Sequence, residues 1–229
     1  MKIGLIGRGP WGAVYAKTLA AMGIEFWQSG RDWRNRSLPD AAIIACAPDA
    51  HYEVAKSLLI RGVPVLIEKP VCDSYSYTQR LMSLAKFMGG IVFVGHTRLY
   101  SNAWREFKAK AQAEGVKSVY AVAGGKCKLA PLWDWGPHLI AMCLDLGFDP
   151  DAAHIITGED EWPLKFVVNG TMTFTDQQES PSPLEVLITE FLAAAAAKKT
   201  DLRGMELGVK VADYIRRNEK KKMQAAHGA

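Results

Sequence analysis

The sequence has few cysteines, and they form no recognisable motif. Its 229 residues contain only Cys46, Cys72, Cys127 and Cys143, with no C-x-x-C pair among them. Without paired cysteines the usual signature of a zinc or thiol redox site is missing, so we expect no metal site. Two of the four stand in apolar runs, where a buried thiol is common. We therefore expect reduced, structural cysteines and a cytoplasmic protein.

Long hydrophobic runs and concentrated charge of one sign are also missing. The most tempting run, residues 191–197, is far shorter than the roughly 20 residues of a membrane span and ends in two lysines. Residues 1–6 pass at once into glycines, unlike a signal peptide. Part of the net charge of +4 comes from residues 216–222, and the central chain has no basic stripe interleaved with aromatics. We expect neither a membrane nor nucleic acid as a partner.

What is present is the composition of an ordinary soluble protein, 49% hydrophobic and 23% charged. The first hundred residues alternate short apolar runs with amphipathic stretches, which predicts a Rossmann-type, doubly wound parallel sheet with helices on both faces. Later residues indicate short strands and a hairpin at Asn169-Gly170. We expect an α/β protein with a dinucleotide-binding domain at 1–100 and a smaller α+β domain for substrate binding and oligomerisation at 101–229. The expected helices are 13–22, 52–61, 74–88, 137–146, 181–199 and 206–217.

A G-x-G-x-x-G run formed by Gly7, Gly9 and Gly12 follows the apolar residues 3–6 and precedes a predicted helix. One glycine permits a tight turn, the next lets the backbone approach a pyrophosphate, and the third lets helix and strand pack closely. The amino end of the helix adds N–H groups and a positive dipole. Arg8 stands where a guanidinium can meet phosphate oxygen, or it is a solvated surface charge. The residues of this loop predicted to bind a cofactor are Gly7, Arg8, Gly9, Pro10, Trp11 and Gly12.

Three further segments carry the more specific pattern. Glu68-Lys69-Pro70 ends a predicted strand, at the carboxyl edge where open α/β sheets hold ligands. Ala47-Pro48-Asp49-Ala50-His51 follows an earlier strand, and Asp134-Trp135-Gly136-Pro137-His138 heads a later helix. With the glycine loop, these segments resemble the glucose-fructose oxidoreductase and inositol dehydrogenase family, Gfo/Idh/MocA. The matches run in order from residue 1 to about 141, and residues 202–215 are similar to the family's closing helix.

The resemblance implies an NAD(P)-dependent oxidoreductase that transfers a hydride between nicotinamide and a hydroxyl or carbonyl carbon of a sugar, cyclitol or related small molecule. The family's catalytic lysine falls on Lys69, its acid on Asp134 and its histidine on His138. A neutral imidazole can accept the hydroxyl proton, and an ammonium stabilises negative charge on the oxygen. Each residue also has a structural alternative: Asp134 as a helix N-cap, His138 as a half-buried core histidine and Lys69 as a solvent-facing charge.

The end of the second predicted strand bears on the cofactor. Residues 26–31 lack the acid that would grip the ribose hydroxyl of NAD, whereas Ser29 and Arg31 offer donors to the 2′-phosphate of NADP. We therefore expect NADP, with NAD as the alternative because Asp32 follows. His51 can bind the cofactor or simply open the helix after Pro48. The remaining residues predicted to bind the cofactor are Ala47, Pro48, His51, Glu68 and Lys69.

Two departures from the family concern the second domain. The chain is shorter than is usual for the family, chiefly between residues 141 and 181, so we expect a truncated substrate domain; Ala141 stands where the family usually has an acid. The shortened region ordinarily supplies substrate walls and the subunit interface, which implies a homo-oligomer, with a dimer favoured. His96 and Arg98 are predicted to contact substrate, although Arg98 can equally hold the two domains together.

Two other functions stay open. The chain could be a non-catalytic NAD(P)-binding sensor or partner subunit, although retention of the three predicted catalytic residues argues against this. It could also be a different Rossmann reductase, acting on an imine or an amino-acid precursor, which fits the Glu-Lys-Pro segment less well. Turnover of sugars and cyclitols distinguishes an enzyme from a sensor.

Overall fold

The structure, a computed structural model, describes residues 1–127 and 129–227, with side chains through residue 221. Two compact units make up the chain. The first consists of Met1–Gly95 and Leu184–Val209, and the second of His96–Pro183 and Lys210–Ala229. The domain division expected from the sequence, at residue 100, stays a prediction.

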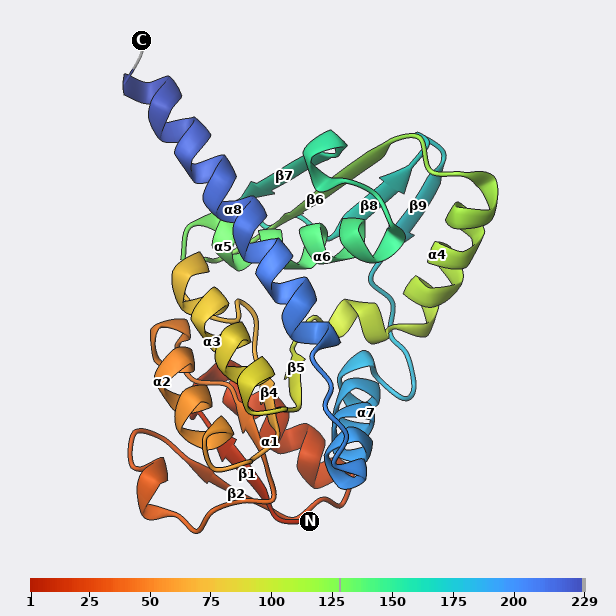
Figure 1. Ribbon diagram of the computed structural model, residues 1–229. Helices are drawn as coiled ribbons and strands as arrows, with labels where there is room; N and C mark the ends of the chain where they lie inside the picture. The colour runs from red at the N-terminus through yellow and green to blue at the C-terminus, as the bar shows by residue number, and fades with distance from the viewer. Residues whose placement is uncertain (128, 228–229) are drawn as a thin grey trace. The chain divides into compact units, whose positions relative to one another are not determined.

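The first unit contains a five-stranded parallel sheet (Figure 1). Its strands are β1 (Ile3–Ile6), β2 (Phe26–Ser29), β3 (Ala41–Ile44), β4 (Val65–Ile67) and β5 (Val92–Val94), in the order β2-β1-β3-β4-β5. Every residue of β1, β3, β4 and β5 is buried. Such continuous apolar strands are typical of a sheet covered by helices on both faces.

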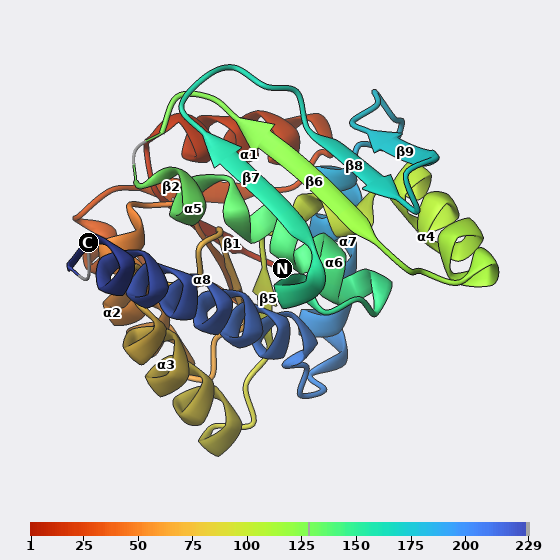
Figure 2. The same cartoon turned by 90° about the horizontal axis from the view of Figure 1, so that it is seen from above.

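Helices cover both faces of this sheet. They are α1 (Pro10–Ala21), α2 (Pro48–Leu59), α3 (Tyr75–Phe87), α7 (Pro183–Ala197) and the first part of α8 (Arg203–His227). On one face Leu66 and Phe93 lie side by side, and Phe93 packs on Phe191 of α7 with ring centroids 5.7 Å apart. On the other face Ile67 and Val94 join a buried cluster with residues of α2 and α3. Figure 2 shows α2 and α3 on one side of the strands and α1 on the other.

The chain reverses direction across the sheet at β1. The next strand, β2, pairs with β1 on one side, and β3 pairs with β1 on the other. Such a reversal opens a crevice outside the carboxyl ends of the two strands, where open α/β sheets bind ligands. Gly7 follows β1 and Ala45 follows β3, so both residues lie at this point. The doubly wound parallel sheet predicted from the sequence is confirmed.

The second unit contains a four-stranded mixed sheet. Its strands are β6 (Val119–Gly124), β7 (His154–Gly158), β8 (Lys165–Val168) and β9 (Met172–Thr175), in the order β7-β6-β8-β9. β6 and β7 are parallel, and the other pairs are antiparallel. Asn169 and Gly170 are the central residues of the turn between β8 and β9, with φ angles of 54° and 74°, the positive values that a type I′ turn requires. The predicted hairpin is confirmed.

Aromatic packing forms the core of the second unit. The helices here are α4 (Asn102–Glu114), α5 (Pro131–Asp134), α6 (Gly136–Leu146) and the later part of α8. Trp104 of α4 is fully buried and meets Phe166 and Phe174 edge-on at 5.2 and 5.3 Å. The sequence did not predict α4, because Trp104, Phe107 and Ala111 give it only a narrow apolar stripe on an otherwise polar helix.

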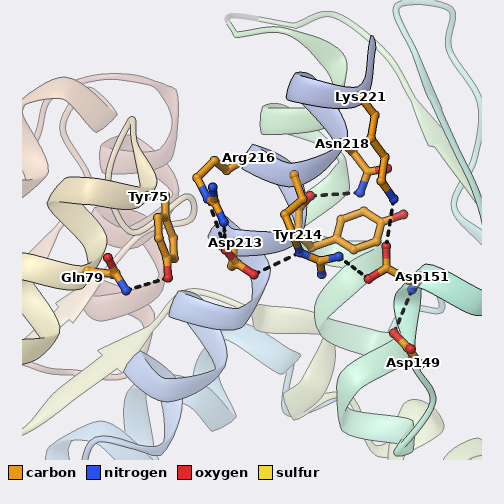
Figure 3. A network of polar contacts seen from close by, with 10 residues as sticks. Tyr75, Gln79, Asp149, Asp151, Asp213, Tyr214, Arg216, Asn218 and Lys221 are labelled. Carbon is orange, nitrogen blue, oxygen red and sulfur yellow. Dashed lines mark hydrogen bonds and ion pairs between the residues drawn. The ribbon is translucent and has the colours of Figure 1, made fainter. Parts of the chain in front are cut away.

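Ion pairs attach α8 to the segment between α6 and β7 within the second unit (Figure 3). The Arg217 guanidinium donates to Asp151 and, at 3.1 Å, to Asp213 one turn earlier. Lys221 lies 3.8 Å from Asp151, and Asp213 also accepts from Arg216 at 2.6 Å. These side chains are partly exposed, so the network orients the helix more than it stabilises the fold. The helix was predicted to end at residue 217 but continues to 227.

Proline marks two helix starts that the sequence analysis placed too late. α1 begins at Pro10 and α2 at Pro48, rather than at residues 13 and 52. At the first position of a helix, proline has the required φ and its missing N–H is no loss. The two helices therefore start directly at the carboxyl edge of the sheet, next to the ends of β1 and β3.

Within the described part of the chain, no helix is both long enough and apolar enough to cross a membrane. No three His, Cys, Asp or Glu side chains gather as metal ligands among those residues either. All four cysteines are free thiols. Burial raises the pKa of Cys46 to about 11 and the pKa values of Cys72 and Cys143 to about 12, so these thiols stay protonated near neutral pH.

The close contact at Gly12 predicts a difference between two alanine variants. A methyl group on Gly12 would lie 2.4 Å from Gly7 O, whereas one on Gly9 would meet no atom within 4 Å. We expect Gly12→Ala to lower the free energy of unfolding by about 1–3 kcal/mol, the usual effect of overpacking, and Gly9→Ala to change it by less than about 0.5 kcal/mol. Urea denaturation measures both, and equal stabilities would contradict the packing argument.

Candidate functional site

The glycine loop has the geometry of a phosphate cradle. Gly7 has a φ of 142°, and a methyl on it would lie 2.3 Å from Ala45 O, so only glycine allows this turn against the end of β3. Gly12 lets α1 pack onto the turn, and Gly9 faces open space. Residues 8–11 are exposed, while Gly7 and Gly12 are buried. The three glycines thus lie as a pyrophosphate site requires.

Gln28 holds this loop in place, a role that the sequence analysis missed. Its amide donates to Gly7 O at 2.8 Å and to Gly12 O at 3.3 Å. The side chain comes from β2, so the neighbouring strand fixes the turn after β1. A polar residue directly after the apolar Phe26 and Trp27 of this strand was the signal in the sequence.

The helices that begin beside this loop have no side-chain caps. Gly9 precedes α1 and Ala47 precedes α2, and neither helix start receives a side-chain hydrogen bond. By contrast, Ser74 caps α3 and Ser101 caps α4. The first N–H groups of α1 and α2 therefore keep their capacity to bind an anion, with the positive end of the helix dipole behind them.

The end of β2 carries charges of both signs. The Ser29 hydroxyl donates to the Asp32 carboxylate at 2.8 Å, and Gly30 N donates to the same oxygen at 3.1 Å. The hydrogen bond from Ser29 is the main cause that holds the pKa of Asp32 below its usual value. A methyl on Gly30 would lie 3.8 Å from both Arg8 Cδ and the Asp32 carboxylate. Arg8 and Asp32 therefore flank this strand end, with Arg31 exposed beside them.

The loop after β4 is built around a buried carboxyl group. Glu68 is 3% exposed and accepts a hydrogen bond from the Tyr15 hydroxyl at 2.7 Å and from Lys69 N at 3.0 Å. Burial raises the pKa of Glu68 to about 7, although Tyr15 and Lys69 oppose the shift. Lys69 itself, which follows β4 at the carboxyl edge of the sheet, is partly exposed. No pattern in the sequence indicates the role of Tyr15.

The ring nitrogens of His51 contact backbone carbonyl groups of the same region. The ring is 1% exposed; Nδ1 lies 3.0 Å from Pro70 O and 3.2 Å from Val71 O, and Nε2 lies 3.1 Å from Cys46 O. Burial lowers the pKa of His51, while these carbonyls and Asp49 oppose the shift. The imidazole thus joins the loop after β3 to the loop after β4. Its predicted contact with a cofactor stays a prediction.

In the second unit, Asp134 and His138 lie at the start of α6. Asp134 ends α5, and its carboxylate accepts a hydrogen bond from Leu129 N at 3.4 Å. The N-cap of α6 is Trp135, which makes no side-chain cap, so the alternative of Asp134 as the cap of this helix is wrong. His138 lies in the first turn of α6 and is 4% exposed. Ala141 of the next turn is buried, where an acid would need a partner.

The two residues predicted to contact substrate differ in their surroundings. His96 is 3% exposed at the start of the second unit. The Arg98 guanidinium forms a two-pronged ion pair with Asp176, through Nε at 3.1 Å and an Nη nitrogen at 2.7 Å. This pair attaches the segment after β9 to the segment before α4. Arg98 therefore has a structural partner within its own unit.

Residues 12–96 match the model of GFO_IDH_MocA, described as an oxidoreductase family with an NAD-binding Rossmann fold. Myo-inositol dehydrogenase Hyg17 from Streptomyces leeuwenhoekii is 32% identical over 74 residues, 32% of this chain and 23% of that protein. The putative oxidoreductase YceM of Salmonella typhimurium is 27% identical over 132 residues, 48% and 43% of the two chains. The chain thus spans less than half the length of these curated relatives.

Similarity of structure extends further along the chain. The crystal structure of a putative oxidoreductase from Magnetospirillum magnetotacticum MS-1 has a TM-score of 0.77 with 22% identity, and the match covers 94% of this chain and 98% of the other. At this identity the likeness shows the fold. Residues 12–96, which hold the Glu-Lys-Pro motif, thus match the family that the motifs predicted, the Gfo/Idh/MocA oxidoreductases with an NAD-binding Rossmann fold.

Proposed function

We propose that the protein is an NAD(P)-dependent oxidoreductase that transfers a hydride between nicotinamide and a hydroxyl or carbonyl carbon of a sugar, cyclitol or related small molecule. The observation that carries this proposal is the exposed glycine loop at the reversal between β1 and β3, with two uncapped helix starts beside it. The family match supports hydride chemistry, and the inositol dehydrogenase among the relatives supports a polyhydroxylated substrate.

The catalytic roles rest on chemistry and on the family pattern. A neutral His138 would accept the hydroxyl proton as hydride leaves the carbon, and the Lys69 ammonium would stabilise negative charge on the oxygen. Asp134 would orient the substrate or favour the charged form of a neighbouring residue. When bound, the nicotinamide would accept or supply the hydride. The glycine loop and the two helix starts would hold the pyrophosphate of the dinucleotide.

NADP is the proposed cofactor, with NAD as the alternative. Arg8 and Arg31 at the end of β2 favour a 2′-phosphate, because a guanidinium can pair with phosphate through two hydrogen bonds. Asp32 favours NAD, because a carboxylate accepts from the ribose hydroxyls but repels a phosphate. The hydroxyl of Ser29 is directed to Asp32, so the arginines carry the preference for NADP.

The predicted homodimer also stays a proposal. The outer face of the second sheet carries partly exposed Val122, Ile156 and Val167 beside Tyr120, which is 39% exposed. The Tyr120 ring stacks on His154 at 5.5 Å. This apolar face supports association with a second copy.

Cofactor preference is tested by Arg31→Ala. We expect the wild type to bind NADP more tightly than NAD, and the variant to lose about 10- to 100-fold in NADP affinity because a charge-assisted hydrogen bond is removed. Its NAD affinity should change little. Titration calorimetry measures both constants, with Arg34→Ala, which removes a guanidinium lying 4.6 Å over the Trp33 ring, as the matched control. Tighter binding of NAD by the wild type would overturn the assignment.

Catalysis is tested with NADP and a panel of sugars and cyclitols, followed by nicotinamide absorbance. We expect Lys69→Ala and His138→Asn to lower kcat by at least about 100-fold, as loss of a general base or an electrostatic stabiliser does, with the affinity for NADP largely retained. Exposed Lys86 gives the control Lys86→Ala, which should keep full turnover. Tight nucleotide binding without turnover of any substrate would favour the sensor instead.

A further inference from the structure

The carboxyl group of Glu68 is hydrogen-bonded from two separate parts of the first unit. One oxygen accepts from the hydroxyl of Tyr15 on α1 at 2.7 Å. The other accepts from Lys69 N in its own loop at 3.0 Å. A carboxylate with a donor on each oxygen is fixed in orientation as well as in position.

Gly95, at the end of β5, supplies the space for this carboxyl group. A methyl on Gly95 would lie 2.6 Å from Glu68 Oε1 and 2.9 Å from its carboxyl carbon. Any side chain there would displace the group that Tyr15 contacts. The carboxyl group is therefore packed between α1, the loop after β4 and the residue that follows β5.

Tyr15 links this group to the glycine loop. It lies on α1 one turn after Gly12 and is fully buried. Water therefore does not reach its hydroxyl to replace Glu68 as the hydrogen-bond partner. A buried hydroxyl and a buried carboxyl are each costly unless they are hydrogen-bonded to a partner. Removing the Tyr15 hydroxyl would therefore take away one of the two hydrogen bonds that orient the carboxyl group to which Lys69 N donates.

We propose that Tyr15 is a positioning residue that acts through Glu68, so that α1 and the glycine loop hold the backbone of Lys69 in one fixed position. The importance of that position for catalysis rests on the proposed function, in which Lys69 contacts the substrate. The contacts between Tyr15, Glu68 and Lys69 do not depend on that function, because they form within the protein without any ligand. Tyr15 and Glu68 thereby join the phosphate-binding end of the first unit to its reactive lysine.

The same contacts set the ionisation of Glu68. Burial raises its pKa to about 7, and the hydrogen bond from Tyr15 and the charge and amide of Lys69 oppose the rise. Tyr15 faces the carboxyl group from α1 and Lys69 from the same loop, and Gly95 lies against it just after β5. Without the Tyr15 hydroxyl, the pKa must rise further, because the charged form loses a donor.

Amide and carboxyl NMR of the protein without ligands tests the proposal. In the wild type, the Glu68 carboxyl carbon and the Lys69 amide should titrate together near pH 7. In Tyr15→Phe, both midpoints should rise by about one unit, equivalent to ~1.36 kcal/mol, and the Lys69 amide hydrogen should exchange faster. The control Tyr52→Phe, on α2, should leave both unchanged. Midpoints that do not move in Tyr15→Phe, or an amide that does not follow the carboxyl, would overturn the proposal.

A second variant keeps the test decisive if Tyr15→Phe does not fold. Glu68→Gln keeps the shape of the side chain but cannot ionise, so the Lys69 amide should lose its titration near pH 7; a persistent titration would contradict the coupling. These measurements need neither nucleotide nor substrate. If the Lys69 amide titrates with Glu68 but the protein turns over no substrate, the proposed function is contradicted and the positioning role of Tyr15 is not.

Glu68 also predicts how stability depends on pH. Its pKa in the folded protein, about 7, lies above the ordinary value of 4.5, so its protonated form favours folding. That contribution is complete below pH 4.5 and is lost as the pH rises through 7. We expect the urea midpoint of Glu68→Gln to exceed that of the wild type by an amount that grows as the pH rises from 4.5 to 7. A constant difference between the two proteins would show that Glu68 does not titrate there.

Discussion

The backbone contact between Gly7 and Ala45 is the constraint on which the first unit depends. Because a methyl on Gly7 would lie 2.3 Å from Ala45 O, the turn after β1 passes the end of β3 with no room for a side chain. The position of this turn fixes where α1 can begin, and Gly12 lets α1 pack against the turn. The uncapped N–H groups of α1 therefore stand at the carboxyl edge of the sheet. Such a site is made mainly of backbone, which is why glycine spacing describes it well.

Buried titratable side chains form a second constraint, around the loop after β4. Glu68 accepts from the backbone of Lys69, and His51 contacts the carbonyls of Pro70 and Cys46. Buried backbone groups outside regular structure need such partners. A polar residue that a motif assigns to a cofactor can thus also support the loop that carries the proposed catalytic lysine. In the second unit, Arg98 is likewise paired within the protein rather than simply exposed.

Prediction from the sequence succeeded where the signal was local. The strands of the first sheet are short apolar runs between helices, and the turn at Asn169-Gly170 depends on two positive φ angles that these residue types favour. α4 was missed because tertiary packing of Trp104, rather than a broad apolar face, holds it in place. α1 and α2 begin earlier than predicted because Pro10 and Pro48 are themselves the first residues of these helices, a position that proline suits.

By itself, the sequence determined the strand, glycine turn and helix at the start of the chain, the parallel sheet, and the motifs that indicate the family. Only the tertiary structure decided which side chains meet. Tyr15 reaches Glu68 across 53 residues of sequence, and Arg98 reaches Asp176 across 78. The physical reason is that periodicity and turn chemistry act between neighbours in the chain, whereas these contacts arise only when packed elements bring distant groups into one buried or partly buried place.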